Sequence, residues 1–333
     1  MALESPKYEY LNEKDTKEML ELFKGERTGF VLVGAKKWFF PYKYTTEGKG
    51  FYNFKVRPDD TWILSYPRSG TTWTQELIWL LSNDLDFNRA RTERLAERFP
   101  FFEYSMFFHS EVTRELIKMN EGDKDKVEFC KKLAEPGYEV LAKLPSKRFI
   151  KSHFPFSLLP NILDSGCKNL NYVLYNPLYN LFLAYWGPYW EHLKEAWANR
   201  NHPNVLFMFY EDMQHDFSKT IREVAKFLGK TYTEEQLKEV ADYLNIKNFR
   251  NNQMVNSSEL NECGIMTKGI FVRKGKSGGW QDIFTEELNA KADKWIEENL
   301  RGTDLVFPSN CLFYYNFSWL IQIILQHIFK YKT

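Results

Sequence analysis

A run of small, hydroxyl-bearing and basic residues interrupts an apolar stretch of the chain. Residues 61–82 read TWILSYPRSGTTWTQELIWLLS, in which a β-branched and apolar run ends at a loop and a helical pattern begins at Thr71. Such a strand, tight loop and helix bring Arg68, Gly70, hydroxyl groups and backbone N–H groups to a helix N-terminus, which carries partial positive charge. A site of this kind binds phosphate or sulfate. We expect the hydroxyl of Thr71 or Thr72 to cap the helix.

Lys151 and His153 form a second element with chemical potential. Residues 148–154, RFIKSHF, predict a short strand in which side chains alternate, so that Lys151 and His153 point the same way. Histidine is mostly neutral near physiological pH, because its unperturbed pKa is about 6.5, and it can then accept a proton. Taken alone, a histidine at a strand end is more often a core or surface residue, and a Ser-Gly-Thr turn is as often an ordinary connection.

A third element is a basic, glycine-rich loop. Residues 272–280 read VRKGKSGGW, where Arg273 and Lys274 supply charge and Gly275 lets the backbone approach an anion closely. The alternative for this loop is a flexible basic surface segment. The chain lacks the GxxxxGKS or GxxxxGKT spacing of nucleoside triphosphatases, which places a triphosphatase or kinase third among the candidate functions.

The aromatic run, residues 98–108 (RFPFFEYSMFF), is too dense for an alternating strand and too interrupted for a regular helix. An apolar aromatic pocket suits a phenol, steroid, retinoid or other hydrophobic alcohol. Core packing is the alternative for each ring, and we favour only Phe101 as a pocket residue. Weaker candidates from an earlier segment are Phe39, Phe40 and Tyr42.

The elements that must position these residues have the pattern of an α/β protein. Apolar strand patterns begin at Thr61, Asn169 and Asn204, and each is followed by a helical pattern. This order predicts one α/β domain with a central parallel sheet flanked by helices. Gly25 to Lys49 is expected to form an irregular layer on the core. Further helices are predicted at Asp15–Phe23, Glu111–Asn120, Val127–Glu135, Thr233–Leu244 and Thr285–Leu300.

Composition excludes several classes of function. The 333 residues are 44% hydrophobic and 17% aromatic, enough for a large core, and the net charge of +1 gives no reason to expect a nucleic-acid partner. The four cysteines show neither CxxC nor Cys/His spacing, so no disulfide framework or metal site is expected. The polar N-terminus lacks the pattern of a signal peptide, which favours a cytoplasmic location.

Four motifs resemble the cytosolic sulfotransferase family. PRSGTTW resembles the PKSGTTW loop that holds the 5′-phosphosulfate of PAPS (3′-phosphoadenosine 5′-phosphosulfate), and IKSHFPFSLLP resembles IKTHLPLSLLP. RFPFFE and VRKGKSGGW resemble RxPFxE and RKGxxGxW, and these pieces follow the order of the family. The stretch RSGTTWTQELIWLLSNDLDF is most similar to the insect branch, which includes retinol dehydratase.

The resemblance implies the sulfotransferase fold with a P-loop-like phosphosulfate-binding loop. It also implies sulfuryl transfer from PAPS to the hydroxyl of a small hydrophobic acceptor, without a metal. His153 would be the general base, Lys151 and Arg68 would stabilise charge, and Phe101 would line the acceptor pocket with His153. The residues implied in donor binding are Arg68, Ser69, Gly70, Thr71, Thr72, Trp73, Arg273, Lys274 and Gly275. In the family the loop tryptophan, here Trp73, stacks on the adenine.

The chain departs from the family pattern on the adenosine side of the donor. Tyr175 and Leu183 stand where the family has the Arg and Ser that hold the 3′-phosphate, and a stretch after Pro177 is missing. Ile246 replaces an aromatic residue of the adenine site. The basic residues that could replace the family's arginine are Lys36, Lys37 and Arg200. The alternative function is therefore a catalytically impaired relative that binds hydrophobic small molecules.

The chain divides into an N-terminal segment (residues 1–40), a sulfotransferase domain (41–308) and an apolar tail (309–333). Residues 311–329 carry no formal charge and are close to the length that spans a membrane. Ser318, Gln322 and Gln326 lie four apart and would form a polar stripe on a helix, so membrane contact is possible but not favoured. Gln281, Glu286 and Ala290 depart from the family's dimerisation motif, so dimerisation is not carried over.

Overall fold

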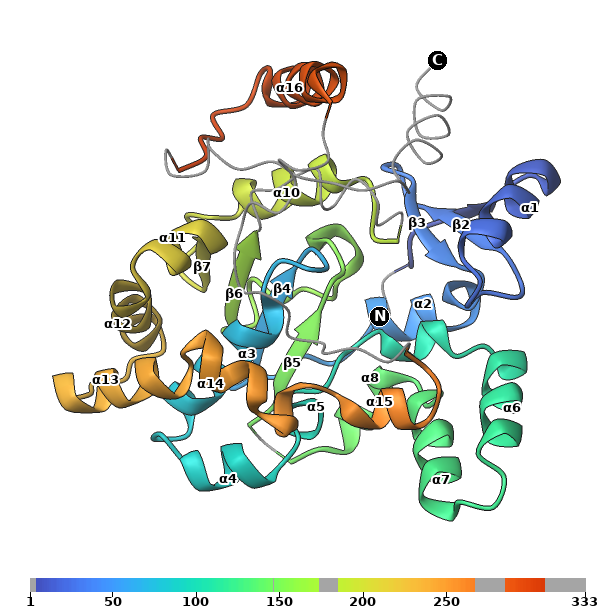
Figure 1. Cartoon of the computed structure of the whole chain (residues 1–333). Coiled ribbons are helices and arrows are strands. Elements are labelled where there is room, and N and C mark those ends of the chain that lie inside the picture. Colours follow the sequence, from blue (N-terminus) through green and yellow to red (C-terminus); the bar gives the residue numbers. More distant parts are fainter. Residues whose placement is uncertain (1–3, 146, 174–184, 267–284, 309–333) are drawn as a thin grey trace.

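The central feature is a four-stranded parallel sheet (Figure 1). The computed structural model describes residues 4–145, 147–173, 185–266 and 285–308. The strands are β4 (Thr61–Ser65), β5 (Phe149–Ser152), β6 (Lys168–Val173) and β7 (Val205–Phe209), in the spatial order β5-β4-β6-β7. All three neighbouring pairs are parallel. The predicted parallel α/β sheet is confirmed.

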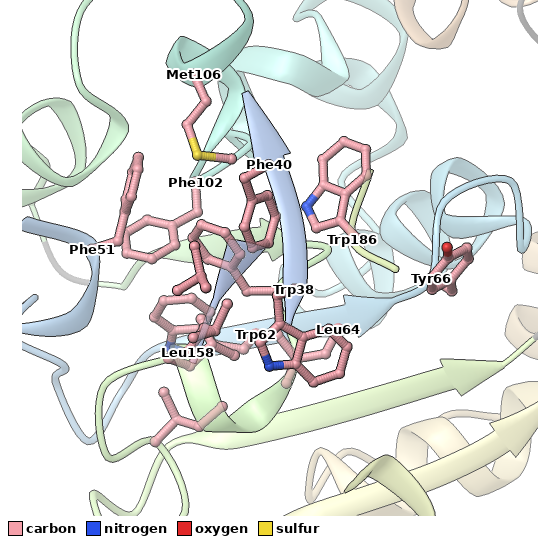
Figure 2. Packing of buried hydrophobic residues seen from close by; sticks show 14 of the residues in the cluster. Trp38, Phe40, Phe51, Trp62, Leu64, Tyr66, Phe102, Met106, Leu158 and Trp186 are labelled. Carbon is pink, nitrogen blue, oxygen red and sulfur yellow. The ribbon is translucent and has the colours of Figure 1, made fainter. Parts of the chain in front are cut away.

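Both faces of the sheet are covered, as expected for β4, in which all five residues are buried. Ile63 faces a cluster formed with α3 (Thr71–Ser82), α12 (Phe217–Phe227) and α13 (Glu234–Tyr243). Its neighbours Trp62 and Leu64 face the other cluster, which Figure 2 shows with Trp38 and Phe40 packed beside them. The period-two alternation of β4 therefore assigns its side chains to two separate cores.

The N-terminal segment forms a second, antiparallel sheet. Its strands are β1 (Tyr8–Tyr10), β2 (Phe30–Val33) and β3 (Trp38–Pro41), and they pair in that order. Helix α1 (Glu13–Leu22) lies between β1 and β2, and α2 (Tyr44–Tyr52) follows β3. The expectation of an irregular layer at Gly25–Lys49 is wrong in this respect, although the segment does pack on the core through Trp38 and Phe40.

A buried ion pair fixes the starts of β4 and β5. Arg148 Nε and Nη2 donate to the two carboxylate oxygens of Asp60 at 2.7 and 2.6 Å, and both side chains are buried. Asp60 precedes β4 and Arg148 precedes β5, so the bidentate pair sets the strands side by side. Thr61 then pairs with Phe149 and Leu64 with Ser152. The two strands therefore end at the same level.

The other helices surround these sheets. Five predicted helices are confirmed with shifted ends: Asp15–Phe23, Glu111–Asn120, Val127–Glu135, Thr233–Leu244 and Thr285–Leu300. A reciprocal capping box of Thr233 and Gln236 begins α13. The remaining elements are α4 (Phe87–Thr92), α5 (Leu95–Arg98), η1 (Tyr104–Phe107), α6 (Ser110–Met119), α7 (Lys124–Leu133), α8 (Gly137–Lys143), η2 (Phe156–Leu158), α10 (Tyr189–Ala198), α11 (Tyr210–His215), α14 (Ile246–Asn251), η3 (Gln253–Val255), α15 (Ser258–Glu262) and α16 (Glu286–Leu300).

Several sequence predictions fall outside the described residues. These are the departures at Tyr175 and Leu183, the basic loop with Arg273, Lys274 and Gly275, and the apolar tail 309–333. Within the described part of the chain, no helix is both long and apolar enough to cross a membrane. The division of the chain at residues 40 and 308 stays a prediction.

Candidate active site

The loop between β4 and α3 turns tightly through two left-handed residues. Arg68 has a φ of 67° and Gly70 a φ of 84°. Glycine adopts this conformation without strain, whereas a residue with a Cβ does so at a cost. Ser69 is buried, and its hydroxyl donates to the carbonyl oxygen of Tyr66. The side chain of Arg68 is exposed. The loop thus places a cation beside the first turn of α3.

Helix α3 begins without the side-chain cap that the sequence predicts. Its N-cap is Gly70, with no side-chain hydrogen bond to the first turn. The hydroxyl of Thr71 instead lies 2.7 Å from the hydroxyl of Ser65 at the end of β4. The expectation that Thr71 or Thr72 caps the helix is therefore wrong. The N–H groups of the first turn keep their preference for an anion.

His153 lies directly after β5, level with Ser65. Its Nδ1 atom is 2.6 Å from the carbonyl oxygen of Ser65 and 3.3 Å from the hydroxyl oxygen of the same residue. A carbonyl oxygen only accepts, so Nδ1 carries the hydrogen in the neutral ring. Nε2 then has a free lone pair, which is the form that a general base requires.

The surroundings of His153 keep the imidazole neutral. Burial lowers its pKa well below 6.5, and the charge of Lys151 and the neighbouring His192 lower it further. The hydrogen bond to Ser65 acts in the opposite direction. His192 donates from Nε2 to the carbonyl oxygen of His153 at 3.0 Å, since this oxygen too can only accept. The imidazole is therefore neutral at physiological pH, and His153 is held from both sides.

Lys151 brings a second positive charge to the same edge of the sheet. Its ammonium lies 4.1 Å from the centroid of the Phe101 ring, a cation–π contact. Burial lowers the pKa of Lys151 to about 8, the charge of Arg68 lowers it too, and that of Glu103 raises it. The charges of Arg68 and Lys151 repel each other, and this repulsion is offset when an anion binds between them.

Aromatic rings enclose the imidazole. His153 meets the rings of Phe101 and Trp186 edge-on, with centroids 5.0 and 5.2 Å away. Phe107 contacts Trp186 at 5.2 Å and also Tyr185 at 5.2 Å. Phe101 is thus placed beside His153 and Lys151, as the sequence predicts. We call Phe101, Phe107, Tyr185 and Trp186 the aromatic wall.

The three weaker pocket candidates lie in different places. Phe39 contacts Tyr185 of the aromatic wall, with centroids 5.7 Å apart. Phe40 is fully buried in the core (Figure 2). Its ring stacks on that of Tyr44. Tyr42 is exposed and stacks on Tyr10. Only Phe39 therefore extends the aromatic wall.

Trp73 lies beside the turn that the family uses for adenine. Its indole N–H donates to the carbonyl oxygen of Leu244 at 2.9 Å, and its ring stacks on Phe217 at 4.3 Å. Leu244 is followed directly by Asn245 and Ile246. The proximity of the loop tryptophan to this turn agrees with the resemblance, whereas its contact with adenine stays a prediction.

Sequence reasoning missed several residues of the site, which are Ser65, Glu103, Phe107, Tyr185, Trp186 and His192. Glu103 ends the RxPFxE-like stretch, and it accepts hydrogen bonds from His153 and Trp186. His192 lies in GPYWEHLKEAW, which resembles a helix of the family. The motif positions were visible in both cases, but the contacts join residues far apart in the chain.

The three basic residues considered as replacements for the family's arginine are engaged elsewhere. Lys36 pairs with Glu191 and Glu195, and Lys37 pairs with Glu9. Arg200 pairs with Asp304 at 2.6 Å. In residues 4–145, 147–173, 185–266 and 285–308, no group of three or more His, Cys, Asp or Glu side chains is arranged to hold a metal ion.

The loop between β4 and α3, residues 66–70, which we call the anion loop, lies at a strand end next to the one that carries His153. An arrangement of this kind suits an α/β transferase that moves an anionic group to a nucleophile. The family model described as "Sulfotransferase domain" matches residues 58–182 and 178–304. The chain therefore belongs to the sulfotransferase family. The two matched ranges overlap at residues 178–182.

Individual relatives agree with this assignment. Luciferin sulfotransferase of Photinus pyralis is 29% identical over 310 residues, which cover 83% of this chain and 81% of the relative. A crystal structure of retinol dehydratase with retinol and PAP, the donor product adenosine 3′,5′-bisphosphate, is 34% identical with a TM-score of 0.84 and covers 91% of this chain and 99% of its own. A second structure, with androsterone and PAP, has a TM-score of 0.83 at 34% identity, with 91% and 98% covered.

Proposed function

We propose that this chain transfers the sulfuryl group of PAPS to the hydroxyl of a small hydrophobic acceptor, with His153 as general base. Membership of the sulfotransferase family gives the class of reaction. The observation that carries the assignment of the base is the contact of Nδ1 with the Ser65 carbonyl oxygen, which leaves Nε2 as a proton acceptor. The residue roles below are part of the proposal.

In the proposed reaction the acceptor hydroxyl loses its proton and gains the sulfuryl group. Nε2 of His153 takes the proton of the acceptor hydroxyl, and the acceptor oxygen forms a bond to sulfur. The bond between sulfur and the phosphate oxygen breaks, and PAP leaves with the electron pair of that bond. The product is a sulfate ester and an imidazolium, which returns its proton to water. No oxidant or reductant is needed.

Lys151 and Arg68 stabilise the negative charge that spreads over oxygen atoms during transfer. Lys151 is half-buried beside His153, so its ammonium acts in a poorly solvated place, where a charge has a larger effect. Arg68 stands where the family usually has lysine, and its planar fork binds two oxygens at once. By analogy with phosphoryl transfer, positioning and electrostatics supply most of the rate.

The first turn of α3 holds the 5′-phosphosulfate, together with Ser69, Gly70, Thr71 and Thr72. For the 3′-phosphate we propose Arg273, Lys274 and Gly275, which lie outside the described residues. One lost hydrogen bond to a charged group weakens binding by about tenfold to a hundredfold, so Tyr175 and Leu183 predict a lower affinity for PAPS than the family pattern would give. Trp73 is proposed to stack on the adenine.

The acceptor lies against the aromatic wall. Phe101 and Trp186 both contact the ring of His153. Phe107, Tyr185 and Phe39 continue the aromatic surface from there. Flat or elongated apolar alcohols suit such a surface. The structural neighbour was solved with retinol and with androsterone, which are hydrophobic alcohols of this kind. We propose that the protein is cytoplasmic. The proposal includes neither dimerisation nor membrane contact through the tail, residues 309–333.

One second candidate is supported by particular residues. Tyr175 and Leu183 in place of 3′-phosphate ligands favour a protein that binds a hydrophobic alcohol without transferring sulfate. In that case PAP binds weakly or not at all, while the aromatic wall still binds its ligand.

The two candidates are separated by titration and turnover of the full-length chain. PAP and adenosine 5′-phosphate are titrated separately by calorimetry, and formation of PAP from PAPS is then followed with retinol, androsterone and a simple phenol. We expect tighter binding of PAP than of adenosine 5′-phosphate, and acceptor-dependent release of PAP. Acceptor binding without any release of PAP would contradict the transferase and favour the binding protein.

A further inference from the structure

Glu103 is a fully buried carboxylate that has no role in the reaction as proposed. Its Oε1 atom accepts the backbone N–H of His153 at 2.6 Å and the indole N–H of Trp186 at 3.0 Å. Its Oε2 atom accepts the hydroxyl of Ser152 at 2.9 Å. One side chain therefore binds both the strand end that carries the base and a ring of the aromatic wall.

The chain delivers Glu103 to this place by pairing along the edge of the sheet. The N–H of Lys151 donates to the carbonyl oxygen of Pro100 at 2.9 Å, and the N–H of Phe102 donates to that of Lys151 at 2.8 Å. Phe101 and Lys151 are thus parallel partners. Phe102 and Glu103 then form a turn, and Glu103 reaches the backbone N–H of His153, two residues after Lys151.

The donors around Glu103 favour an ionised carboxylate. Three N–H and O–H groups point to its two oxygens, and an ionised carboxylate accepts them without carrying a hydrogen of its own. The titratable group whose charge acts on it is Lys151, and this charge favours ionisation. Burial acts in the opposite direction and raises the pKa of Glu103 to about 7.

We propose that Glu103 is a positioning residue, which holds the backbone of His153 and the indole of Trp186 in one fixed arrangement around the acceptor hydroxyl. This role rests on the function proposed above, because it assumes that His153 is the base. The imidazole contacts both Phe101 and Trp186 edge-on, so a shift of either the strand end or the indole changes the approach of Nε2 to the acceptor. A misplacement of about 1 Å costs on the order of a hundredfold in rate.

Glu103→Gln and Glu103→Ala separate shape and hydrogen bonds from charge. Glutamine has the same shape, its oxygen accepts the N–H groups of His153 and Trp186, and its amide N–H donates to the Ser152 hydroxyl. It therefore keeps the arrangement but removes the charge that supports Lys151. Alanine removes both.

Glu47→Gln is the matched control. Glu47 is also a buried carboxylate, and it accepts a serine hydroxyl, that of Ser105, at 2.7 Å. Its other oxygen pairs with Lys43 at 2.9 Å. Neither partner belongs to the proposed catalytic set. This variant reports the cost of altering a buried carboxylate in the same region.

The kinetic test compares kcat, acceptor KM and PAP affinity among the folded variants, with kcat corrected for the folded fraction. We expect Glu103→Ala to lower kcat by on the order of a hundredfold with PAP affinity unchanged, as for a misplaced base. Glu103→Gln should restore most of kcat below neutral pH, while the alkaline limb of its pH profile moves to lower pH because Lys151 loses a negative neighbour. Equal kcat for Glu103→Ala and Glu47→Gln, or equal loss in both Glu103 variants, would overturn the proposal.

A spectroscopic test does not depend on turnover. The chain has 10 tryptophans, and ¹⁵N labelling of their indoles gives a small set of N–H signals in which Trp186 is assigned by Trp186→Phe. The Trp186 signal should move in Glu103→Ala far more than in Glu103→Gln, and should stay in place in Glu47→Gln. An unmoved signal in Glu103→Ala would overturn the positioning role. If the wild-type chain transfers no sulfate, the proposed function fails, and this spectrum still tests Glu103.

Discussion

The Nδ1 atom of His153 lies 2.6 Å from the carbonyl oxygen of Ser65, which joins the ends of β5 and β4. The contact exists because Asp60 and Arg148 set the two strands in register, and Leu64 pairs with Ser152 one residue before. It fixes the tautomer of the imidazole. The proposed function depends on this relationship more than on any other.

The pH dependence of kcat/KM should be bell-shaped. In the proposed function His153 acts as a base only when neutral. Its pKa is lowered well below 6.5, so the acid-side loss of activity should lie well below pH 6.5. Lys151 acts only when protonated, and its pKa is lowered to about 8, so activity falls as the pH rises through that value. Initial rates across pH with limiting acceptor test this prediction, because kcat/KM reports groups of the free enzyme.

Lys151→Arg identifies the alkaline limb. Arginine stays protonated in proteins, so the alkaline limb should disappear from the accessible range even though the changed geometry lowers the rate. An alkaline limb that persists near the wild-type position in Lys151→Arg would assign it to another group.

Gly70→Ala should weaken donor binding as well as stability. Gly70 has a φ of 84°, and a residue with a Cβ in this region costs about 1–2 kcal/mol. The backbone N–H groups of the anion loop also lose their arrangement. Gly229→Ala is the control, because Gly229 has a φ of 70° and open space around its Cα, away from the loop. Both variants should lower Tm, and only Gly70→Ala should weaken PAP binding in a titration. Equal PAP affinity in the two variants would contradict the anion loop.

Breaking the buried pair of Asp60 and Arg148 should be strongly destabilising. Arg148→Ala leaves an uncompensated buried carboxylate, and such changes cost about 3–5 kcal/mol. Arg222→Ala, which breaks a pair with Glu234 at the surface, should leave stability unchanged within error. Denaturant unfolding measures both. A small effect for Arg148→Ala would mean that this pair does not set the register of β4 and β5.

Local patterns in the sequence were enough to predict the parallel sheet and the placement of its catalytic candidates. Strand and helix patterns alternate strongly at residues 61–82, and RFIKSHF spaces Lys151 and His153 by two, so both follow from the chain's own periodicity. The antiparallel N-terminal sheet was missed, since β2 (FVLV) and β3 (WFFP) are short, continuous apolar runs that show no period of two.

Contacts between distant residues could not be predicted in the same way. Even across one loop, Thr71 fits the preferences of a helix cap, but its hydroxyl contacts that of Ser65, because the loop folds back on the end of β4. Glu103 lies 83 positions from Trp186 in sequence, so its role as an acceptor for the indole depends on tertiary structure. The positions of both residues are fixed by local pattern, whereas their partners are fixed by the fold.

The most direct test of the central claim is the rate of PAP formation from PAPS and a hydrophobic alcohol, measured for the wild-type chain and for His153→Asn, with PAP affinity as the control. General base catalysis contributes about 10²–10⁴-fold, so we predict a loss of that size in His153→Asn with unchanged PAP affinity. Equal rates in the two proteins, or no acceptor-dependent PAP formation by the wild-type chain, would contradict the account.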